Sequence, residues 1–408
     1  MRISTANLYS TSTTQLNNLQ SALARTQMQL STDRRLLTPA DDPVASARAL
    51  EVSQSQNINA QFATNRSSAS SAMAHVESSL QNAGDLIQEI QTLAVSAGNG
   101  TMLQGDREKL ATELEGRLAD LLGVANTSDG AGGFLFSGYK TTTQPFTASA
   151  DGATYQGDQG VRQLQVSDSR KVPLSASGSA IFEAIPTGNG VFQTKAADGN
   201  QGAAIISSGS IVDRSQFDSS KKYAIEFSVT ADTPPVTTYS VYTTNPRAEV
   251  PNQQAIAYQE GKQIAFDGMA LDIKGVPAQG DSFSVEPSQK ESVFKTVTDL
   301  ISTLRLPGDG STGKAELTNK LNTAISNLQN AHDNVLTQQA SVGAHMKELD
   351  YLSSAGDDLD IQYATTLDDL QGLDTVKAIS DFSQQQLTLQ AAQMTFKTMS
   401  GLSLFNVI

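Results

Sequence analysis

A glycine-rich segment is the first feature of the chain with the residue types to bind a ligand. From Gly308 to Lys314 it matches most of a phosphate-binding loop, in which backbone N–H groups surround the phosphates and a lysine reaches them. In that loop a serine or threonine follows the lysine and contacts magnesium, but Ala315 stands at this position. A helical pattern also precedes the segment, where the loop requires a strand. We therefore predict a flexible turn between two helices and no nucleotide site.

The histidines are the next candidates for chemistry, and His75, His332 and His345 are the only ones. No pair has the spacing of a zinc site, and no nucleophile elbow accompanies them. His345 falls on the apolar seam of a predicted helix, where an interior histidine with a hydrogen-bond partner is commoner than a ligand. The sequence thus indicates no metal site and no catalytic site, and we expect neither an enzyme nor a cofactor.

An acidic run near the C-terminus has the charge of a calcium loop but not its pattern. It comprises Asp357, Asp358, Asp360, Asp368, Asp369 and Asp374. The run lacks the glycine and the closing glutamate of such a loop. Because residues 1–66 are mildly basic, we predict that the run is a solvated helix face or one that meets the N-terminal helix. Exposed ion pairs of this kind contribute only ~0.2–1 kcal/mol each.

Apolar stripes at the two ends of the chain are the elements that most constrain its function. Near the start, apolar and small residues from Tyr9 to Leu30 recur three and four apart, which is coiled-coil spacing. One narrow stripe cannot stabilise a helix alone, so each end must pair with the other or with a neighbouring subunit. The predicted assembly residues are Ile3, Leu8, Leu16, Leu19, Leu23, Leu30, Val376, Ile379, Phe382, Leu387, Leu402, Leu404 and Phe405.

Composition narrows the class of protein. The chain has 408 residues, no cysteine and a net charge of −14. Without cysteine it has no disulfide framework, and the negative charge argues against nucleic acid or an anionic membrane as main partner. No stretch is long and apolar enough to cross a bilayer, so we expect no membrane insertion. The N-terminus lacks the features of a secretory signal, which indicates a cytosolic protein or one exported by another route.

Two kinds of periodicity divide the chain. Helical spacing runs from Ala45 to Val124 with a turn at residues 98–100, and it returns from Glu291 in a seam too long for an ordinary globular helix. Between these blocks the period is two, with a tight hairpin predicted from Phe266 to Met269.

These patterns predict an α+β fold that is mainly α. A helical rod, with long coiled-coil helices from both chain ends, carries an inserted all-β outer domain, which is either one domain or two smaller ones. We assign 1–42 and 362–408 to a terminal coiled-coil domain, 43–138 and 289–361 to the rod, and 139–288 to the β domain. The ends are rich in Ser, Thr and Gln, so we expect the terminal domain to be disordered in the monomer and to order on assembly.

A bend is predicted between the first helix and the second. Thr38 and Pro39 end the first helix, because the residue before a proline disfavours helical geometry. Asp42 and Pro43 then have the types expected for an N-cap and a first helical residue.

Several motifs resemble one family, the bacterial flagellins and hook-associated proteins. The stretch from Leu30 to Ala45 resembles the family signature, and its Asp-Asp-Pro-Val-Ala form is similar to the hook-associated members. The turn after Leu93 and the segment from Ala125 to Lys140 also resemble family motifs, as does the ending Leu402-Ser-Leu-Phe405. The β module at 264–283 resembles one shared among hook-associated proteins. At one position the chain departs from the flagellins: Glu89 stands where many carry an arginine, in the stretch that innate immune receptors recognise.

The resemblance implies a structural part of the bacterial flagellum at the junction between hook and filament. Its implied partners are hook-associated protein 1, flagellin, copies of itself in a ring and a flagellar export chaperone. The family is exported through the flagellar type III apparatus, which implies an extracellular location without a cleaved signal peptide. Two alternatives stay open, a filament flagellin and a β-domain adhesin or glycan binder.

Overall fold

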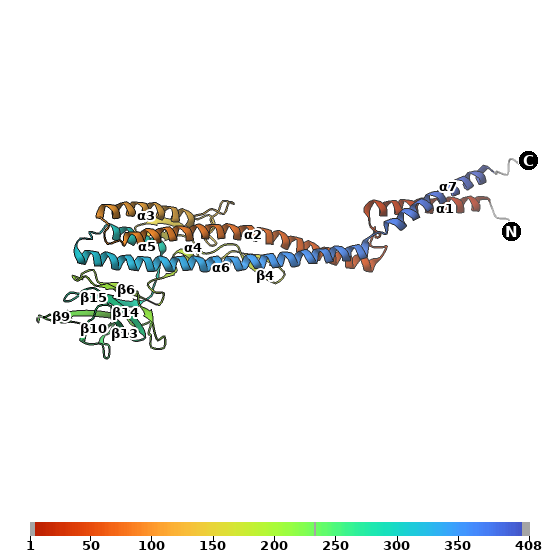
Figure 1. Cartoon of the computed structure of the whole chain (residues 1–408). Coiled ribbons are helices and arrows are strands. Elements are labelled where there is room, and N and C mark those ends of the chain that lie inside the picture. The colour runs from red at the N-terminus through yellow and green to blue at the C-terminus, as the bar shows by residue number, and fades with distance from the viewer. Residues whose placement is uncertain (1–4, 232–233, 402–408) are drawn as a thin grey trace, which may run out of the picture. The chain divides into compact units, whose positions relative to one another are not determined.

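The structure, a computed structural model, describes residues 5–231 and 234–401. It divides into a first unit, residues 1–66 with 350–408, and a second unit, residues 67–349. The helices, labelled in Figure 1, are α1 (Thr5–Thr32), α2 (Pro43–Ala97), α3 (Gln104–Ala125), α4 (Gly178–Phe182), α5 (Val293–Leu304), α6 (Gly310–Gln371) and α7 (Thr375–Gly401). The predicted class, α+β and mainly α with strands inserted between two helical halves, is confirmed.

The strands all lie between α3 and α5 in the sequence. They are β1 (Phe146–Ser149), β2 (Gly152–Tyr155), β3 (Gln163–Ser167), β4 (Arg170–Pro173), β5 (Ile185–Pro186), β6 (Phe192–Ala196), β7 (Ile205–Ile206), β8 (Ser210–Ile211), β9 (Tyr223–Val229), β10 (Thr237–Thr244), β11 (Arg247–Glu249), β12 (Ile256–Ala257), β13 (Gln263–Phe266), β14 (Met269–Lys274), β15 (Ser282–Pro287) and β16 (Lys290–Glu291). The strand pairs of these sheets are antiparallel, which suits a chain joined by short turns.

In the second unit, α2 and α6 pack through apolar seams. Leu80, Ile87 and Ile90 of α2 are fully buried, as are Leu328 and Val335 of α6. These residues recur at helical spacing, and no proline interrupts either helix after Pro43, so both can run long. Helices α3 and α5 lie beside them, and most of the strands gather on the other side of α6 (Figure 1).

The larger group of strands has its own core. A six-stranded sheet follows the order β11-β10-β9-β15-β6, with β12 beside β10, and a four-stranded sheet contains β13, β14, β7 and β8. Phe192, Ile225, Phe227, Phe283 and other apolar side chains from both sheets form one buried cluster. The hairpin joins Phe266 to Met269 through Asp267 and Gly268, whose positive φ angles of 42° and 77° fit a primed turn.

The strands before residue 185 pack elsewhere. Phe146 of β1 contacts Phe182 of α4 at 5.6 Å and Phe294 of α5 at 5.0 Å between ring centroids, and Phe136 contacts Phe182 at 5.8 Å. This aromatic cluster packs β1 and α4 against α5. The segment 139–288 is therefore distributed over two packed parts, while the domain boundaries given above stay a prediction.

Two local expectations need correction. Only 305–309 connects α5 to α6, because α6 begins at Gly310, so most of the glycine-rich segment forms the first turn of a helix rather than a loop. His345 lies at the edge of the α6 seam, with its side chain 32% exposed and Nδ1 3.6 Å from Glu348 Oε2, rather than in the interior. Spacing alone places His345 on the seam but does not distinguish the edge of the seam from its centre.

Candidate assembly surface

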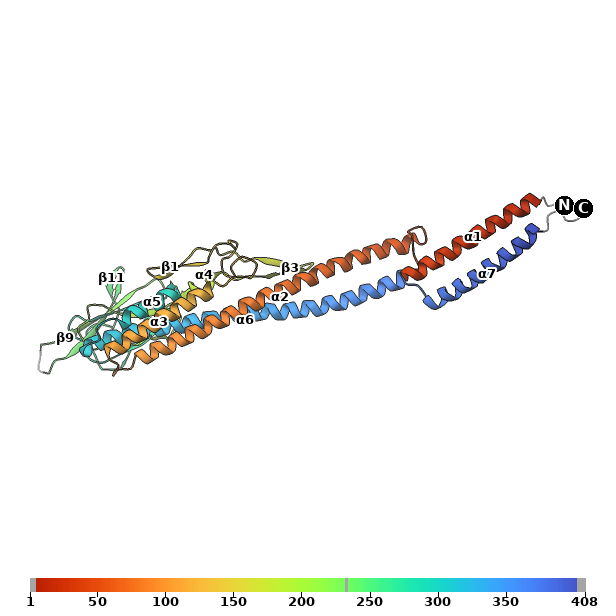
Figure 2. The same ribbon diagram turned by 90° about the horizontal axis from the view of Figure 1, so that it is seen from above.

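In the first unit, the first and last helices of the chain, α1 and α7, pair with each other. Figure 2 shows α1 and α7 side by side, as does Figure 1. Thr26 of α1 donates a hydrogen bond to Gln385 of α7 at 3.0 Å, and the rings of Tyr9 and Phe396 lie 5.0 Å apart. On α7 the covered residues recur four and three apart: Ala378, Phe382, Gln385, Leu389, Ala392 and Phe396. This is a heptad seam with small and polar members.

The opposite side of α7 carries a second apolar row, which we call the outward stripe. It consists of Val376, Ile379, Leu387 and Met394, with exposed fractions of 79%, 56%, 71% and 68%. Leu387 and Leu389 are two residues apart, so their side chains point about 200° apart around the helix. The stripe therefore faces away from α1. Four large apolar side chains on one exposed helix face mark a surface suited to binding another apolar helix.

The predicted assembly residues fall into three groups in the structure. Leu16, Leu19, Leu23, Leu30 and Phe382 are partly buried, and Phe382 lies in the seam that joins α7 to α1. Val376, Ile379 and Leu387 belong to the outward stripe. Ile3, Leu402, Leu404 and Phe405 lie outside the described residues, and Leu8 lies in α1 without a described side chain. The role of all of these residues in assembly stays a prediction.

Asp41 and Asp42 organise the bend between α1 and α2. Asp41 Oδ2 accepts hydrogen bonds from the N–H groups of Leu37 and Thr38, both at 3.0 Å, and Oδ1 lies 2.5 Å from Arg25. These contacts lower the pKa of Asp41, and the hydrogen bond from the Thr38 N–H has the largest effect. The Leu37 N–H and the Arg25 charge lower the pKa further, whereas desolvation raises it. Asp42 Oδ1 accepts from Ala45 N–H at 3.0 Å, and α2 begins at Pro43.

A second connection, between α6 and α7, is tied to this bend. The Arg35 N–H donates to Gln371 O at 2.7 Å, and its guanidinium donates to Leu370 O at 2.9 Å. Arg34 and Gly372 form an antiparallel bridge. Asp374 then accepts from Lys377 N–H at 2.9 Å at the start of α7. The two chain reversals thus hold each other, so α1 and α7 leave them as a pair.

Some of these contacts have no clear signal in the sequence. Met394 completes the outward stripe but was not predicted, although its spacing from Leu387 is one heptad. The seam of α7 uses Ala378, Gln385 and Ala392, which a search for large apolar residues passes over. Asp41 contacts Leu37 and Thr38, four and three positions back, only because the chain reverses at the bend.

Known proteins resemble the chain along its length. A sequence profile of the bacterial flagellin N-terminal helical region matches residues 3–141. The flagellar hook-associated protein 3 of Salmonella typhimurium is 28% identical over 411 residues, which covers 100% of this chain and 99% of that protein. The crystal structure of flagellar hook-associated protein 3 from Legionella pneumophila is 32% identical, with a TM-score of 0.74 over 78% of this chain and 98% of that one. The chain belongs to the flagellar hook-associated protein 3 family.

A second solved structure places the same family in the flagellum. The flagellar junction protein FlgL from Legionella pneumophila has 32% identity and a TM-score of 0.72, over 80% of this chain and all of that one. The chain is therefore a flagellar protein of the hook-associated protein 3 family. Among residues 5–231 and 234–401, no helix has the length and apolar character needed to cross a membrane.

Proposed function

We propose that the chain is a structural subunit that joins the hook of the bacterial flagellum to its filament and has no catalytic role. Its paired terminal helices would enter the axial part of the assembly, and copies of the chain would form a ring. One axial face would contact hook-associated protein 1 and the other the first flagellin subunits.

The outward stripe of α7 carries this proposal. Val376, Leu387 and Met394 are more than two-thirds exposed although α7 already uses its other side to bind α1. Burial of such a side chain contributes ~1.5–3 kcal/mol, so three of them can supply much of a helix–helix contact between subunits. Head-to-tail contacts between non-identical surfaces build a ring where the rotation closes and an open helix where it does not, so contacts of this kind suit a ring of subunits in an axial assembly.

Export and location follow from the same proposal. The subunit would travel unfolded through the flagellar type III apparatus and fold at the distal end, outside the cell. Before export, a cytoplasmic chaperone would cover the C-terminal segment, including the outward stripe, because an exposed apolar helix face promotes premature association.

The test uses a strain that lacks this gene and is complemented with variants. Val376→Ser, Leu387→Ser and Met394→Ser together should leave the purified subunit folded but abolish the junction, giving bare hooks by electron microscopy and flagellin in the medium. A matched control changes three exposed polar residues of α7, Gln384→Ser, Gln386→Ser and Thr395→Ser, and should restore filaments.

The strain without the gene also distinguishes the main alternative. Bare hooks together with flagellin lost to the medium would place the subunit at the junction. Intact hooks with normal filaments would instead identify a dispensable filament flagellin and would overturn the proposal.

A further inference from the structure

Four asparagines form a row along α6 that faces the strands of the second unit. They are Asn319, Asn327, Asn330 and Asn334, and their spacing of eight, three and four places them on one face of the helix. Asn319 and Asn327 are only 7% and 5% exposed. Asparagine is a poor residue for a helix interior and is costly to bury, so a row of amides with two buried members on one face requires a specific cause.

The bonds of Asn319 and Asn327 show that cause. Asn319 Oδ1 accepts the Ile206 N–H at 2.9 Å, while its Nδ2 donates to Ala204 O at 3.0 Å. Asn327 Oδ1 accepts the Gly188 N–H at 2.9 Å. Each amide thus offers an acceptor to a main-chain N–H. Asn319 also donates to a main-chain carbonyl, as a neighbouring β-strand would, whereas Asn327 donates to the Glu291 carboxylate at 3.3 Å.

Asn330 and Asn334 continue the row with donors. Asn330 Nδ2 lies 2.7 Å from Pro186 O and 2.8 Å from Gly188 O. Asn334 Nδ2 lies 3.0 Å from Ala180 O and 2.8 Å from Ile181 O. These bonds, like those of Asn319 and the Oδ1 bond of Asn327, end on main-chain atoms. Asn327 Nδ2 also donates to one side chain, Glu291 Oε1, at 3.3 Å. The row therefore recognises mainly the backbone.

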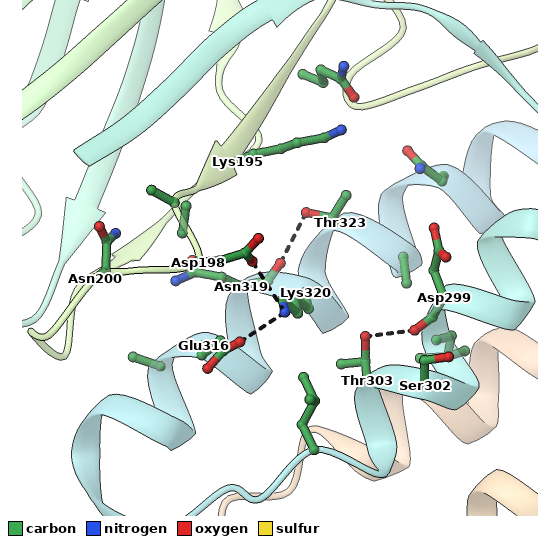
Figure 3. A pocket seen from close by; sticks show the side chains of 18 of the residues that line it. Lys195, Asp198, Asn200, Asp299, Ser302, Thr303, Glu316, Asn319, Lys320 and Thr323 are labelled. Carbon is green, nitrogen blue, oxygen red and sulfur yellow. Dashed lines mark hydrogen bonds and ion pairs between the residues drawn. The ribbon is translucent and has the colours of Figure 1, made fainter. Parts of the chain in front are cut away.

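The space on either side of the row is hollow. A cavity of about 440 Å³ lies between α5, α6 and the start of the β6–β7 connection, and Figure 3 shows Asn319 in its wall with Lys320, Thr323 and Asp198. A second cavity of about 290 Å³, lined by Ile206, Ser207 and Asn322, lies near the other edge of the row. Both flanks therefore lack the close apolar packing that would otherwise hold the strands on the helix.

We propose that Asn319, Asn327 and Asn330 form the attachment site of the β-rich part, 185–291, on α6, and that these three amides are the positioning residues for that part. Asn334 continues the row to α4. Two exposed contacts extend the row, Thr312 Oγ1 to Gln201 O at 2.7 Å and Lys320 Nζ to Asp198 at 3.4 Å. Solvent competes with such exposed contacts, so the buried amides dominate the attachment. The orientation of the strands on the helix then depends on amide chemistry at these positions.

Hydrogen exchange with the full chain tests each bond separately. Asn319→Leu should speed exchange at the Ile206 amide, and Asn327→Leu should speed it at the Gly188 amide, each on the order of 10- to 100-fold because a buried N–H loses its only acceptor there. Asn322→Leu is the matched control, since Asn322 is exposed on the same helix and makes no side-chain hydrogen bond within the part of the chain that the structure describes. It should leave both amides at the wild-type rate.

A distance measurement tests whether the amides fix the orientation of the β-rich part on α6. Spin labels are attached at Val276→Cys, beside the strands, and at Leu336→Cys on α6, both of which are exposed positions. The chain has no other cysteine, so the labels report only the distance between these two sites. Asn319→Leu with Asn327→Leu should broaden the distance distribution. If those variants do not fold, Asn330→Asp at a partly exposed position should broaden it, because a carboxylate then faces two carbonyl oxygens. Wild-type exchange at Ile206 and Gly188, or a distribution as narrow as that of Asn322→Leu, would overturn the inference.

Discussion

At the scale of residues, short polar side chains satisfy main-chain groups where regular structure stops. The first N–H groups of a helix have no partner within it. Asp42 accepts one of them at the start of α2, Ser292 at the start of α5 and Asp374 at the start of α7. Asp41 likewise accepts the N–H groups of Leu37 and Thr38 in the chain reversal before α2. The chain thus specifies its turns by carboxylates and hydroxyls placed within a few residues of each helix start.

Asp41 leads to a pH-dependent prediction. Its pKa lies below the ordinary value of 3.8, so its contribution to stability is fully present above about pH 4 and is lost as the pH falls through the lowered folded-state pKa. We expect Asp41→Asn to weaken the bend at neutral pH, because the Arg25 partner and one strong acceptor are lost. Hydrogen exchange at the Leu37 and Thr38 amides measures this.

The control for Asp41 is Glu51→Gln, an exposed acid on α2. It should leave exchange at Leu37 and Thr38 unchanged. Exchange in the wild type should accelerate below about pH 4 beyond the intrinsic rate, and Asp41→Asn should abolish that extra acceleration. Equal pH profiles for wild type and Asp41→Asn would show that the carboxylate does not hold the bend.

At the scale of elements, the long helices are predictable because their signal is local and repeated many times. The spacing of Leu80, Ile87 and Ile90 alone indicates a buried helical face. The order of the strands cannot be predicted in this way, because β15 pairs with β6 and β9, from which many residues separate it. The asparagine row escapes sequence reasoning for a related reason: polar residues on a helix face are normally solvated, and only the folded strands show that these are covered.

Gly84 offers a test of how closely α2 and α6 pack. It is the only glycine of α2, and a Cβ at this position would lie 3.7 Å from Val335 Cγ1, which is ordinary van der Waals contact. Gly84→Ala should therefore stabilise the protein by ~1 kcal/mol through helix propensity, and raise the melting temperature by about 2–4 °C. Thermal unfolding followed by circular dichroism measures the change. A lower melting temperature would mean that the helices approach more closely at Gly84 than described.

At the scale of the whole molecule, the β-rich part is an insertion whose two ends meet. β5 pairs with β16, and the Thr187 N–H donates to Gln289 O at 2.9 Å, so the chain enters and leaves at one place. The apolar cluster of the larger sheets contains residues from 192 to 285 and none from a helix. The helical seams likewise draw on residues outside this range. Each part therefore has an apolar core of its own, and the chain passes between the two parts at one place. We expect each part to fold without the other.

Removing the insertion tests that separation. Replacing residues 188–288 by Asn-Gly should close a two-residue hairpin between the paired residues Thr187 and Gln289. Asn319 and Asn327 would then become solvated, which removes any cost of burying them. We expect the helical signal per molecule to be retained and the melting temperature of the helical part to shift by no more than about 4 °C, roughly 1 kcal/mol for a domain of this size. Circular dichroism measures both. A truncated chain that loses its helical signal would show that the helices depend on the strands for their fold, and the β-rich part would then be a structural support of the second unit rather than an attachment to it.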